Sequence, residues 1–421
     1  MSTGPARARV IRFPLSTGDG RRRPVPASTG SKRRFGALLE LRDPESRSGW
    51  GEASPLAGFP DDSPGRAAAA LLRLLADSEA MNALFGTAQE FARGADAGER
   101  ERVLPGSAAR VLEELQAQSS SARAAVVSAL FDLAGRRAGL PTHELLLSAA
   151  TDPSQEALES GSGRGRVGPG TRPSMSGYPI NALIPLSDSE AVLEAAAEAH
   201  RRGIRVLKAK LGTGEQLDRQ LPLLDLVRAE YGTGMTLRLD ANGAWSADEC
   251  PRILERLAPL DPEYVEEPVS GAALLDLHGS PVPLAADESL RDPDLASALL
   301  ACDEISVFVL KPSLLGGIDR CMELGRRAAA RGRRCVVTHA FGGPVAHGAA
   351  CEAALALAAL AAGGTGPQVP AQGLDRIGVL DAWPDITVPQ LRGPGLLPAE
   401  ISGHGIDPAP LIERAAGDGR I

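Results

Sequence analysis

The chain contains 421 residues, of which 43% are hydrophobic and 23% charged, and its formal net charge is -8. This balance is ordinary for a globular protein, and the length allows two or three domains with a large core. The acidic charge, with Lys and Arg spread along the chain, excludes the basic face that nucleic-acid-binding domains normally carry. We therefore expect no nucleic-acid partner.

The cysteines and the apolar segments indicate a protein of a reducing compartment. The five cysteines form neither a C-x-x-C pair nor a Cys/His cluster with zinc spacing. The first residues lack the apolar core of a signal peptide. The most apolar stretch, residues 349–362, contains Glu352 and looks too short to span a bilayer. These features predict a cytoplasmic protein without a membrane segment.

The first 145 residues predict an α+β domain. Extended runs at residues 7–15, 34–42 and 48–53 read as strands. Helical patterns follow at residues 63–77 and 121–137, and the second stops at Gly139 and Pro141. Strands followed by helices favour a separate α+β unit at the N-terminus.

Residues 146–177 predict a flexible linker or insertion. The stretch from 151 to 177 is rich in Ser, Gly, Pro and Arg and has almost no large apolar side chains. Such a composition cannot bury enough surface to fold on its own. A functional loop is the alternative interpretation.

From residue 178 to about residue 390, short β-like runs alternate with helical stretches, which predicts a (β/α) barrel. The barrel would be of the (β/α)7β TIM type, and residues 391–421 would pack back on the N-terminal domain. A doubly wound sheet is disfavoured because no G-x-G-x-x-G follows an early strand. The predicted strands are residues 179–184, 204–210, 237–240, 264–266, 284–287, 305–311 and 335–339.

Five consecutive predicted strands, from the second to the sixth, end in ionisable residues. These residues are Lys208 and Lys210, Asp240, Glu266 with Glu267, Asp287, and Lys311, and successive positions lie 21 to 30 residues apart, which is one βα repeat. Because barrel enzymes place their chemistry at the C-terminal ends of strands, these side chains should meet at one mouth.

The three converging carboxylates predict a divalent metal site. Close carboxylates repel each other unless a cation neutralises them. Oxygen ligands favour Mg²⁺, with Mn²⁺ as a possibility, and the lack of His or Cys at these strand ends disfavours zinc. The ligands would be Asp240, Asp287 and one of Glu266 and Glu267, since strand side chains alternate in direction.

The flanking lysines predict removal of a proton beside a carboxylate. A carbon acid of this kind needs a base with a suitable pKa and a positive site for the charge that develops. We expect Lys210 and Lys311 to fill these roles, and we expect a cation and a second lysine to lower the pKa of the base. The ligand would be a small-molecule carboxylate, and the sequence predicts no oligomeric state.

The ordered motifs resemble the enolase superfamily, in its muconate-lactonising-enzyme subgroup, from about Val10 to about Leu397. The resemblance implies a capping domain over the barrel, Glu266 as the second metal ligand, and a lysine pair as the acid-base groups. The matching motifs are G-W-G-E-A-S-P-L at 49–56, K-x-K at 208–210, D-A-N at 240–242, E-E-P at 266–268, D-E-S at 287–289 and K-P at 311–312.

Within the subgroup, residues 179–184, Arg238 and the segment around Asp375 are similar to the o-succinylbenzoate synthases. This resemblance implies Mg²⁺-dependent syn dehydration of 2-succinyl-6-hydroxy-2,4-cyclohexadiene-1-carboxylate in menaquinone biosynthesis. Lys210 would take the proton and return it to the leaving hydroxyl, while Lys311 would stabilise the dienolate. The residues expected to bind substrate are Lys208, Arg238 and Asn242.

Other reactions share the same catalytic set: N-acylamino-acid racemisation, dipeptide epimerisation and muconate cycloisomerisation. Dipeptide epimerases typically carry an acidic pair after strand eight, whereas Asp375 stands alone here. The mandelate-racemase branch normally uses an Asp/His dyad after strands six and seven, but strand six here ends in Lys311. We therefore interpret His339, after strand seven, as a substrate-shell or structural residue rather than a base. A non-catalytic scaffold would give no reason to bury these charges.

Overall fold

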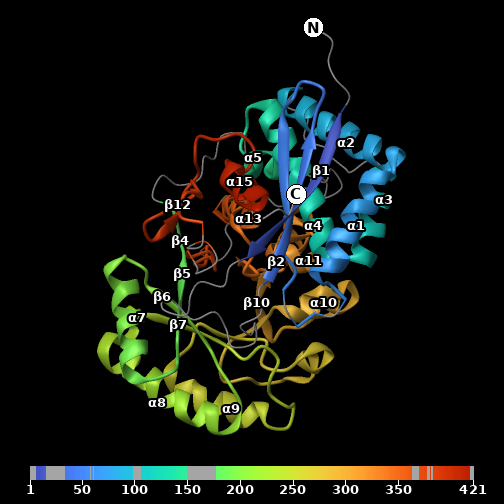
Figure 1. Cartoon of the computed structure of the whole chain (residues 1–421). Helices are drawn as coiled ribbons and strands as arrows, with labels where there is room; N and C mark the ends of the chain where they lie inside the picture. The colour runs from blue at the N-terminus through green and yellow to red at the C-terminus, as the bar shows by residue number, and fades with distance from the viewer. Residues whose placement is uncertain are drawn as a thin grey trace.

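The computed structural model of the chain (Figure 1) describes residues 6–15, 34–56, 58–59, 61–97, 106–148, 177–362, 369–376, 380 and 383–417. The predicted linker at 146–177 lies outside these ranges except at its two ends, so its conformation is not described.

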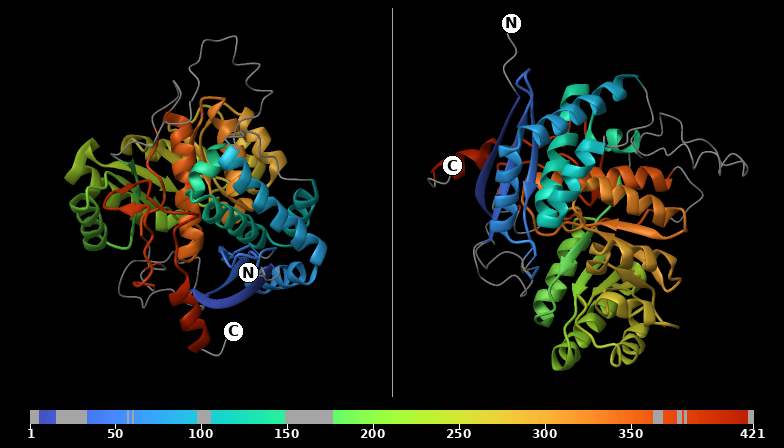
Figure 2. Two further views of the ribbon diagram at one scale, coloured as in Figure 1. Left: turned by 90° about the horizontal axis from the view of Figure 1, so that it is seen from above. Right: turned by 90° about the vertical axis from the view of Figure 1, so that its right-hand side faces the viewer.

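The N-terminal domain is an antiparallel three-stranded sheet covered on one face by helices, as Figures 1 and 2 show. The three predicted strands are confirmed at their predicted residues. Three helices, α2, α3 and α5 (Thr142–Ser148), were not predicted from the sequence. The strands are β1 (Arg7–Leu15), β2 (Arg34–Arg42) and β3 (Ser48–Ala53), and the helices are α1 (Pro64–Ala76), α2 (Ser78–Ala97), α3 (Gly106–Gln118) and α4 (Ser120–Ala138).

Helix α4 is the core of this domain, and two glycines allow the sheet to lie against it. The helix starts at Ser119, whose hydroxyl accepts a hydrogen bond from Ala122 N at 3.1 Å, and ends at Gly139 in the left-handed conformation. A side chain on Gly51 would place its Cβ 1.8 Å from the backbone oxygen of Ala125. The G-W-G motif thus sets the close approach of β3 and α4.

The C-terminal domain is a parallel barrel, which confirms the predicted fold class and excludes a doubly wound sheet. Seven parallel strands are hydrogen-bonded in sequence order. Gln372 bridges to Ile180 and Gly373 bridges to Thr338, so this segment acts as strand eight and closes the barrel. The strands are β5 (Asn181–Ile184), β6 (Val206–Lys210), β7 (Thr236–Asp240), β8 (Tyr264–Glu266), β9 (Leu284–Ala286), β10 (Ile305–Leu310) and β11 (Arg334–Val337).

Helices surround the barrel between successive strands (Figure 1). A short 3-10 segment, η4 (Gly271–Asp276), stands after β8 where the other repeats carry an α-helix. The remaining elements are α7 (Ser189–Arg201), α8 (Gly214–Tyr231), α9 (Cys250–Leu257), η5 (Glu288–Arg291), α10 (Pro293–Ala301), α11 (Pro312–Leu315), α12 (Ile318–Ala329) and α13 (Pro344–Ala362).

The chain after the barrel returns to the N-terminal domain (Figure 2). Residues of β4 (Tyr178–Pro179), β12 (Leu391–Arg392) and β13 (Gly395–Leu396) form a small sheet at the barrel's edge. His404 N then donates to the Asp132 carboxylate of α4 at 2.6 Å, and α15 (Ala409–Gly417) packs on β1. The C-terminal segment therefore joins the two domains.

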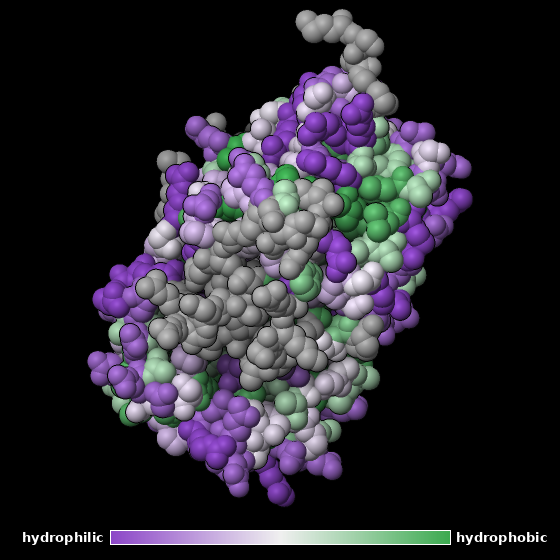
Figure 3. All heavy atoms as spheres, in the orientation of Figure 1, coloured by the Kyte–Doolittle hydropathy of each residue, from purple (hydrophilic) through white to green (hydrophobic). Residues whose placement is uncertain are grey.

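Helix α13 is long and apolar enough, by composition, to cross a membrane, with a mean hydropathy of 1.6. It is longer than the stretch singled out in the sequence, but 78% of its 18-residue apolar window is buried inside the protein, so it serves as a core helix. Figure 3 shows an apolar area over the N-terminal helices. Leu72, on α1, is 58% exposed.

We expect Gly51→Ala to destabilise the protein by about 3 kcal/mol, because the new Cβ would meet backbone that cannot move away cheaply. Urea unfolding measures the change. Gly65→Ala is the matched control: Gly65 lies in α1 with open space around its Cβ position, so this change should stabilise by about 0.5–1 kcal/mol. Equal stability of the two variants would contradict the packing of β3 on α4.

Candidate active site

The barrel brings the predicted charged residues together at one mouth because their strands are in register. Lys210 lies beside Asp240 across β6 and β7, and Asp240 lies beside Glu266 across β7 and β8. Asp287 and Lys311 follow the last residues of β9 and β10. These residues point inward, and Asp240, Glu266 and Asp287 are almost fully buried.

Lys208 lies between two of the carboxylates. Its Nζ is 2.6 Å from Glu266 Oε1 and 3.0 Å from Asp240 Oδ2, and the side chain is 12% exposed. The residue starts one layer below the mouth, in register with Arg238, and its length carries the ammonium up to the carboxylates. Lys208 therefore neutralises charge inside the site.

Lys210 is the more accessible lysine, with 29% of its side chain exposed. Its Nζ donates to Asp240 Oδ2 at 3.0 Å and also to Asn242 Oδ1. Asn242 holds the left-handed conformation, with a φ of 50°, and its backbone N–H donates to Asp240 Oδ1. The D-A-N turn thus orients both the carboxylate and the amide toward Lys210.

Lys311 faces a second pair of carboxylates on the other side of the mouth. Its Nζ donates to Asp287 Oδ2, and to Glu288 Oε1 at 2.6 Å. Glu288 also lies 3.4 Å from Asn242 Nδ2, so it connects the two lysine groups. The sequence did not single out Glu288, although it stands in the D-E-S motif.

The electrostatics reflect close pairing of opposite charges. Burial alone would raise the pKa of Asp240, but Lys208, Lys210 and Lys311 outweigh it and lower that pKa. Burial would likewise lower the pKa of Lys208, yet Asp240 and Glu266 raise it well above its usual value. The pKa of Lys311 is raised against its burial by Asp287 and Glu288. Lys208 and Lys311 each contact two carboxylates, and these contacts raise the pKa values of both lysines.

The residues at the mouth fit a hard divalent cation by donor type. Within the described ranges, no three Asp, Glu, His or Cys side chains are already arranged around a common point, and Lys208 stands between two of the candidate ligands. Glu266 Oε2, however, is buried and has no hydrogen-bond partner. Three oxygen donors on adjacent strands, one of them unpaired, are a set that Mg²⁺ can take once Lys208 shifts.

Arg238 lies deeper than the sequence suggested. It has no exposed surface, and its guanidinium donates to Glu263 at 2.7 Å, Asn181 at 3.0 Å and the backbone oxygen of Ala371 at 2.7 Å. It also stacks over the ring of Tyr264, 5.0 Å from its centroid. We therefore interpret Arg238 as a residue that holds the barrel interior together, in place of the expected contact with substrate.

Glu267 supports the site from behind. Glu266 occupies the mouth, whereas Glu267 turns away with a φ of 42° and accepts hydrogen bonds from Asp287 N at 2.8 Å and Ser289 N at 3.0 Å. Burial raises its pKa to about 7. The E-E-P and D-E-S motifs therefore act together, because Glu267 fixes the turn that presents Asp287.

The acidic residue after strand eight is already paired. Arg202, at the C-terminal end of α7, donates to both carboxylate oxygens of Asp375, one of them at 3.0 Å. Asp375 is therefore bound to a guanidinium of the barrel wall. His339 lies at the end of strand seven, where its ring packs against those of His347 and Phe341.

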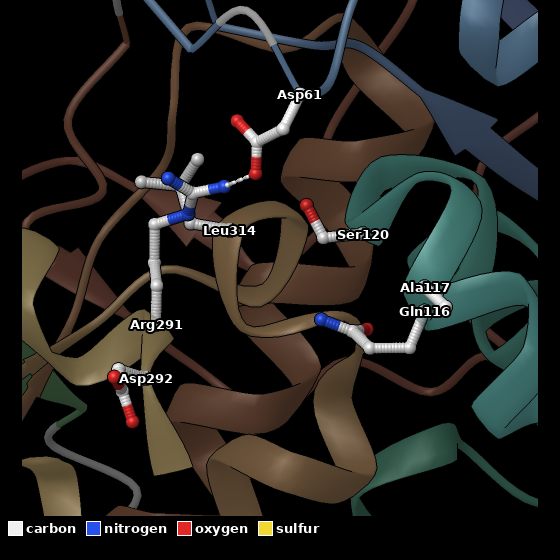
Figure 4. Close-up of a pocket in the computed structure, with 7 residues that line it drawn as sticks. All are labelled: Asp61, Gln116, Ala117, Ser120, Arg291, Asp292 and Leu314. Atoms are coloured by element: carbon white, nitrogen blue, oxygen red, sulfur yellow. Dashed lines mark hydrogen bonds and ion pairs between the residues drawn. The ribbon is translucent and has the colours of Figure 1, made fainter. Parts of the chain in front are cut away.

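A cavity of about 320 Å³ lies where the N-terminal domain meets the loops after β9 and β10 (Figure 4). Arg291, from η5, crosses it and pairs with Asp61 at 2.6 Å, while its guanidinium stacks over Phe59. η5 follows Asp287 directly, and α11 follows Lys311. The lining residues are Asp61, Gln116, Ala117, Ser120, Arg291, Asp292 and Leu314.

Two family models match the chain. The model described as "Enolase C-terminal domain-like" matches residues 191–405, and the model described as "Mandelate racemase / muconate lactonizing enzyme, N-terminal domain" matches residues 17–146. Together they cover both domains.

Curated relatives carry different activities at similar identity. A hydrophobic dipeptide epimerase of Roseobacter litoralis is 30% identical over 222 residues, which is 51% of this chain and 56% of the relative. An o-succinylbenzoate synthase of Thermobifida fusca is 32% identical over 149 residues, which is 35% of this chain and 46% of the relative. The chain thus matches less than two thirds of the length of these relatives.

Solved structures share the whole fold at low identity. The muconate lactonizing enzyme of Pseudomonas putida has a TM-score of 0.67 at 21% identity, with 99% of both chains covered. A dipeptide epimerase from Enterococcus faecalis, complexed with Mg and L-Leu-L-Tyr, has a TM-score of 0.67 at 19% identity, covering 97% of this chain and all of that one. At these identities the likeness shows the fold alone.

We expect Lys311→Met to destabilise the protein by about 3–5 kcal/mol at pH 8, because it leaves the buried Asp287 and the partly buried Glu288 without their cation. The loss should shrink at pH 5. In the variant, both acids would have pKa values in the folded state that lie above their pKa values in the unfolded state. The stability of the variant should therefore fall as the pH rises from 5 to 8. Urea unfolding at both pH values measures this. Arg256→Met removes one partner of an exposed ion pair and is the control, which should lower stability by less than about 0.5 kcal/mol. A loss of stability in Lys311→Met that does not change with pH would contradict the pairing of Lys311 with its carboxylates.

Proposed function

The chain belongs to the enolase superfamily, in the subgroup of the muconate-lactonizing enzymes, and on this premise we propose that it removes the proton beside a substrate carboxylate. The observation that carries the proposal is the barrel mouth, where lysines and carboxylates from five consecutive strands form ion pairs with one another. Burying this many charges destabilises the folded state, and a purely structural role gives no reason to keep them there.

The topology supports opposed roles for two lysines. In the closed barrel, β6 is strand two and β10 is strand six of eight, so Lys210 and Lys311 stand on opposite walls. A planar carbanion held between them would present one face to each lysine. Lys210 is the more exposed of the two and contacts Asn242 as well as Asp240, and we assign it the role of base.

We assign Asp240, Glu266 and Asp287 as the residues that would hold a divalent cation, Mg²⁺ or Mn²⁺. When bound, the cation would hold the substrate carboxylate, stabilise the developing negative charge and compete with the lysines for the carboxylates. Lys208 lies between Asp240 and Glu266, so it is the group that must move aside.

The specific reaction that we propose is syn dehydration to o-succinylbenzoate. Neutral Lys210 takes the proton from the carbon beside the carboxylate, and the same ammonium returns it to the departing hydroxyl, which leaves as water. Lys311 remains protonated and stabilises the dienolate from the other face. The identity to o-succinylbenzoate synthase supports this assignment, and so does the pairing of Asp375 with Arg202, which engages this carboxylate with a guanidinium of the protein rather than with a substrate ammonium.

Epimerisation or racemisation of an acylated amino acid is the second candidate. The opposed lysines suit it, because one could remove the proton while the other returns it on the opposite face. The hydrophobic dipeptide epimerase among the relatives supports this reading. The two reactions use the same base and differ in whether the substrate carries a leaving group.

The purified chain with Mg²⁺ should convert 2-succinyl-6-hydroxy-2,4-cyclohexadiene-1-carboxylate to o-succinylbenzoate, followed by ultraviolet absorbance. Lys210→Ala should lower kcat about 10²–10⁴-fold, which is the usual contribution of a general base. Arg256→Ala, at the exposed pair with Asp218, is the control and should retain the full rate.

The same preparation should be incubated with N-acylamino acids and dipeptides in D₂O. Racemisation with deuterium incorporation, and no dehydration, would overturn the synthase assignment while preserving the proton-abstraction chemistry. Dehydration that survives Lys210→Ala would overturn the assignment of the base.

A further inference from the structure

His339 stands at the barrel mouth in a defined tautomer. Thr338 N bonds to Leu310 O at 3.0 Å, so Thr338 is level with Lys311 and His339 comes next in the chain. The backbone N–H of Phe341 donates to His339 Nδ1 at 3.3 Å. An Nδ1 that accepts a hydrogen bond carries no proton, so the neutral ring must hold its proton on Nε2.

The N-terminal domain fixes the turn that sets this tautomer. Phe341 has a φ of 53°, a left-handed conformation that costs a bulky residue about 1–2 kcal/mol and persists only where neighbours enforce it. Arg34, the first residue of β2, donates to Phe341 O at 2.8 Å and to Pro55 O at 2.9 Å. Arg34 is itself buried, so this contact holds the turn firmly.

A second contact holds the same turn on its other side. The Glu52 carboxylate, from β3, accepts hydrogen bonds from the backbone N–H groups of Gly343, Val345 and Ala346 at the start of α13. A carboxylate at a helix N-terminus is favoured by the unpaired N–H groups there. The turn after strand seven is thus held at both ends by the N-terminal domain.

The charges around His339 keep the ring neutral. Burial lowers its pKa well below the usual value, with further contributions from His347, Lys208 and Lys311. The ring of His347 stacks on that of His339, with 5.3 Å between the ring centroids. His347 Nε2 also hydrogen-bonds to Leu374 O, which holds His347 against the barrel wall. Nε2 of His339 makes no hydrogen bond to any described residue, and the side chain is only partly buried. The one donor of the ring therefore remains available.

We propose that His339 is a substrate-binding residue that donates an Nε2–H hydrogen bond to an anionic oxygen of the bound carboxylate substrate, in an orientation fixed by Arg34 through Phe341. The inference rests on the proposed function for the identity of the ligand. A role as general base is excluded by the same geometry, because the lone pair on Nδ1 faces Phe341 N and Nε2 carries the proton. The sequence left open whether His339 is a substrate-shell or a structural residue.

The tautomer can be tested without any substrate. Nitrogen-15 NMR of the imidazole groups in the full chain, assigned with His339→Gln, should show His339 neutral and protonated at Nε2 between pH 6 and pH 8. Arg34→Met should release the turn and give a mixture of tautomers. An imidazolium, an Nδ1–H tautomer, or a spectrum unchanged by Arg34→Met would overturn the inference, whatever reaction the enzyme catalyses.

The hydrogen bond to the substrate is tested with the substrate that the wild-type chain turns over in the panel above. His339→Phe keeps the ring that stacks on His347 but removes the donor, and kcat/KM should fall about 10- to 100-fold, as for loss of a hydrogen bond to a charged group. His339→Gln restores an N–H donor and should recover most of that loss. A glutamine variant as impaired as the phenylalanine variant would overturn the role.

The link to Arg34 is tested by a double variant. If Arg34 acts through the orientation of His339, then Arg34→Met combined with His339→Phe should lose little more kcat/KM than His339→Phe alone. Independent, multiplicative losses would contradict the link. Urea unfolding of each variant separates loss of fold from loss of the hydrogen bond, since His339→Phe should unfold at nearly the wild-type urea concentration. Failure of every substrate in the panel would reject the proposed function and leave the tautomer measurement to decide this inference.

Discussion

The structure depends on the pairing of opposite charges at the mouth of the barrel. Three carboxylates and three lysines project from adjacent strands into the mouth, and the buried carboxylates Asp240, Glu266 and Asp287 would be costly to ionise without the lysines beside them. Their pairing lowers the pKa of Asp240 and raises those of Lys208 and Lys311. The site is therefore an electrostatic unit, in which a bound cation or substrate must displace a contact that already exists.

The N-terminal domain is connected to this unit by buried polar contacts. Arg123 of α4 donates to Gly316 O and to Asp319, directly after the loop of Lys311. Glu52 and Arg34 hold the turn after strand seven. Glu52 lies on β3 and Arg123 on α4, which pack closely together, and Arg34 lies on β2, which pairs with β3. The domain thus contributes to the mouth through the backbone of barrel loops as well as by covering it.

The sequence predicts most of this fold, and the reasons differ by element. The three N-terminal strands and the barrel repeat follow from simple alternation and turn residues, and the charged strand ends stand out because the period is regular. Helices α2, α3 and α5 were not predicted, although α2 and α3 are both amphipathic. The roles of Arg238 and Glu267 could not be predicted, because depth in a barrel and the direction of a turn residue depend on register between strands. We infer that the tautomer of His339 depends on Arg34, which lies 307 positions from its partner Phe341 in the chain.

The central claim is that Asp240, Glu266 and Asp287 form one cation site flanked by the catalytic lysines. Anomalous diffraction from crystals of the full chain grown with Mn²⁺ tests it most directly, without any assumption about the substrate. The account predicts one strong manganese peak bonded to all three carboxylates, with the Lys208 ammonium moved out from between Asp240 and Glu266. A mouth without manganese, with Lys208 still bridging the two carboxylates, would contradict the account.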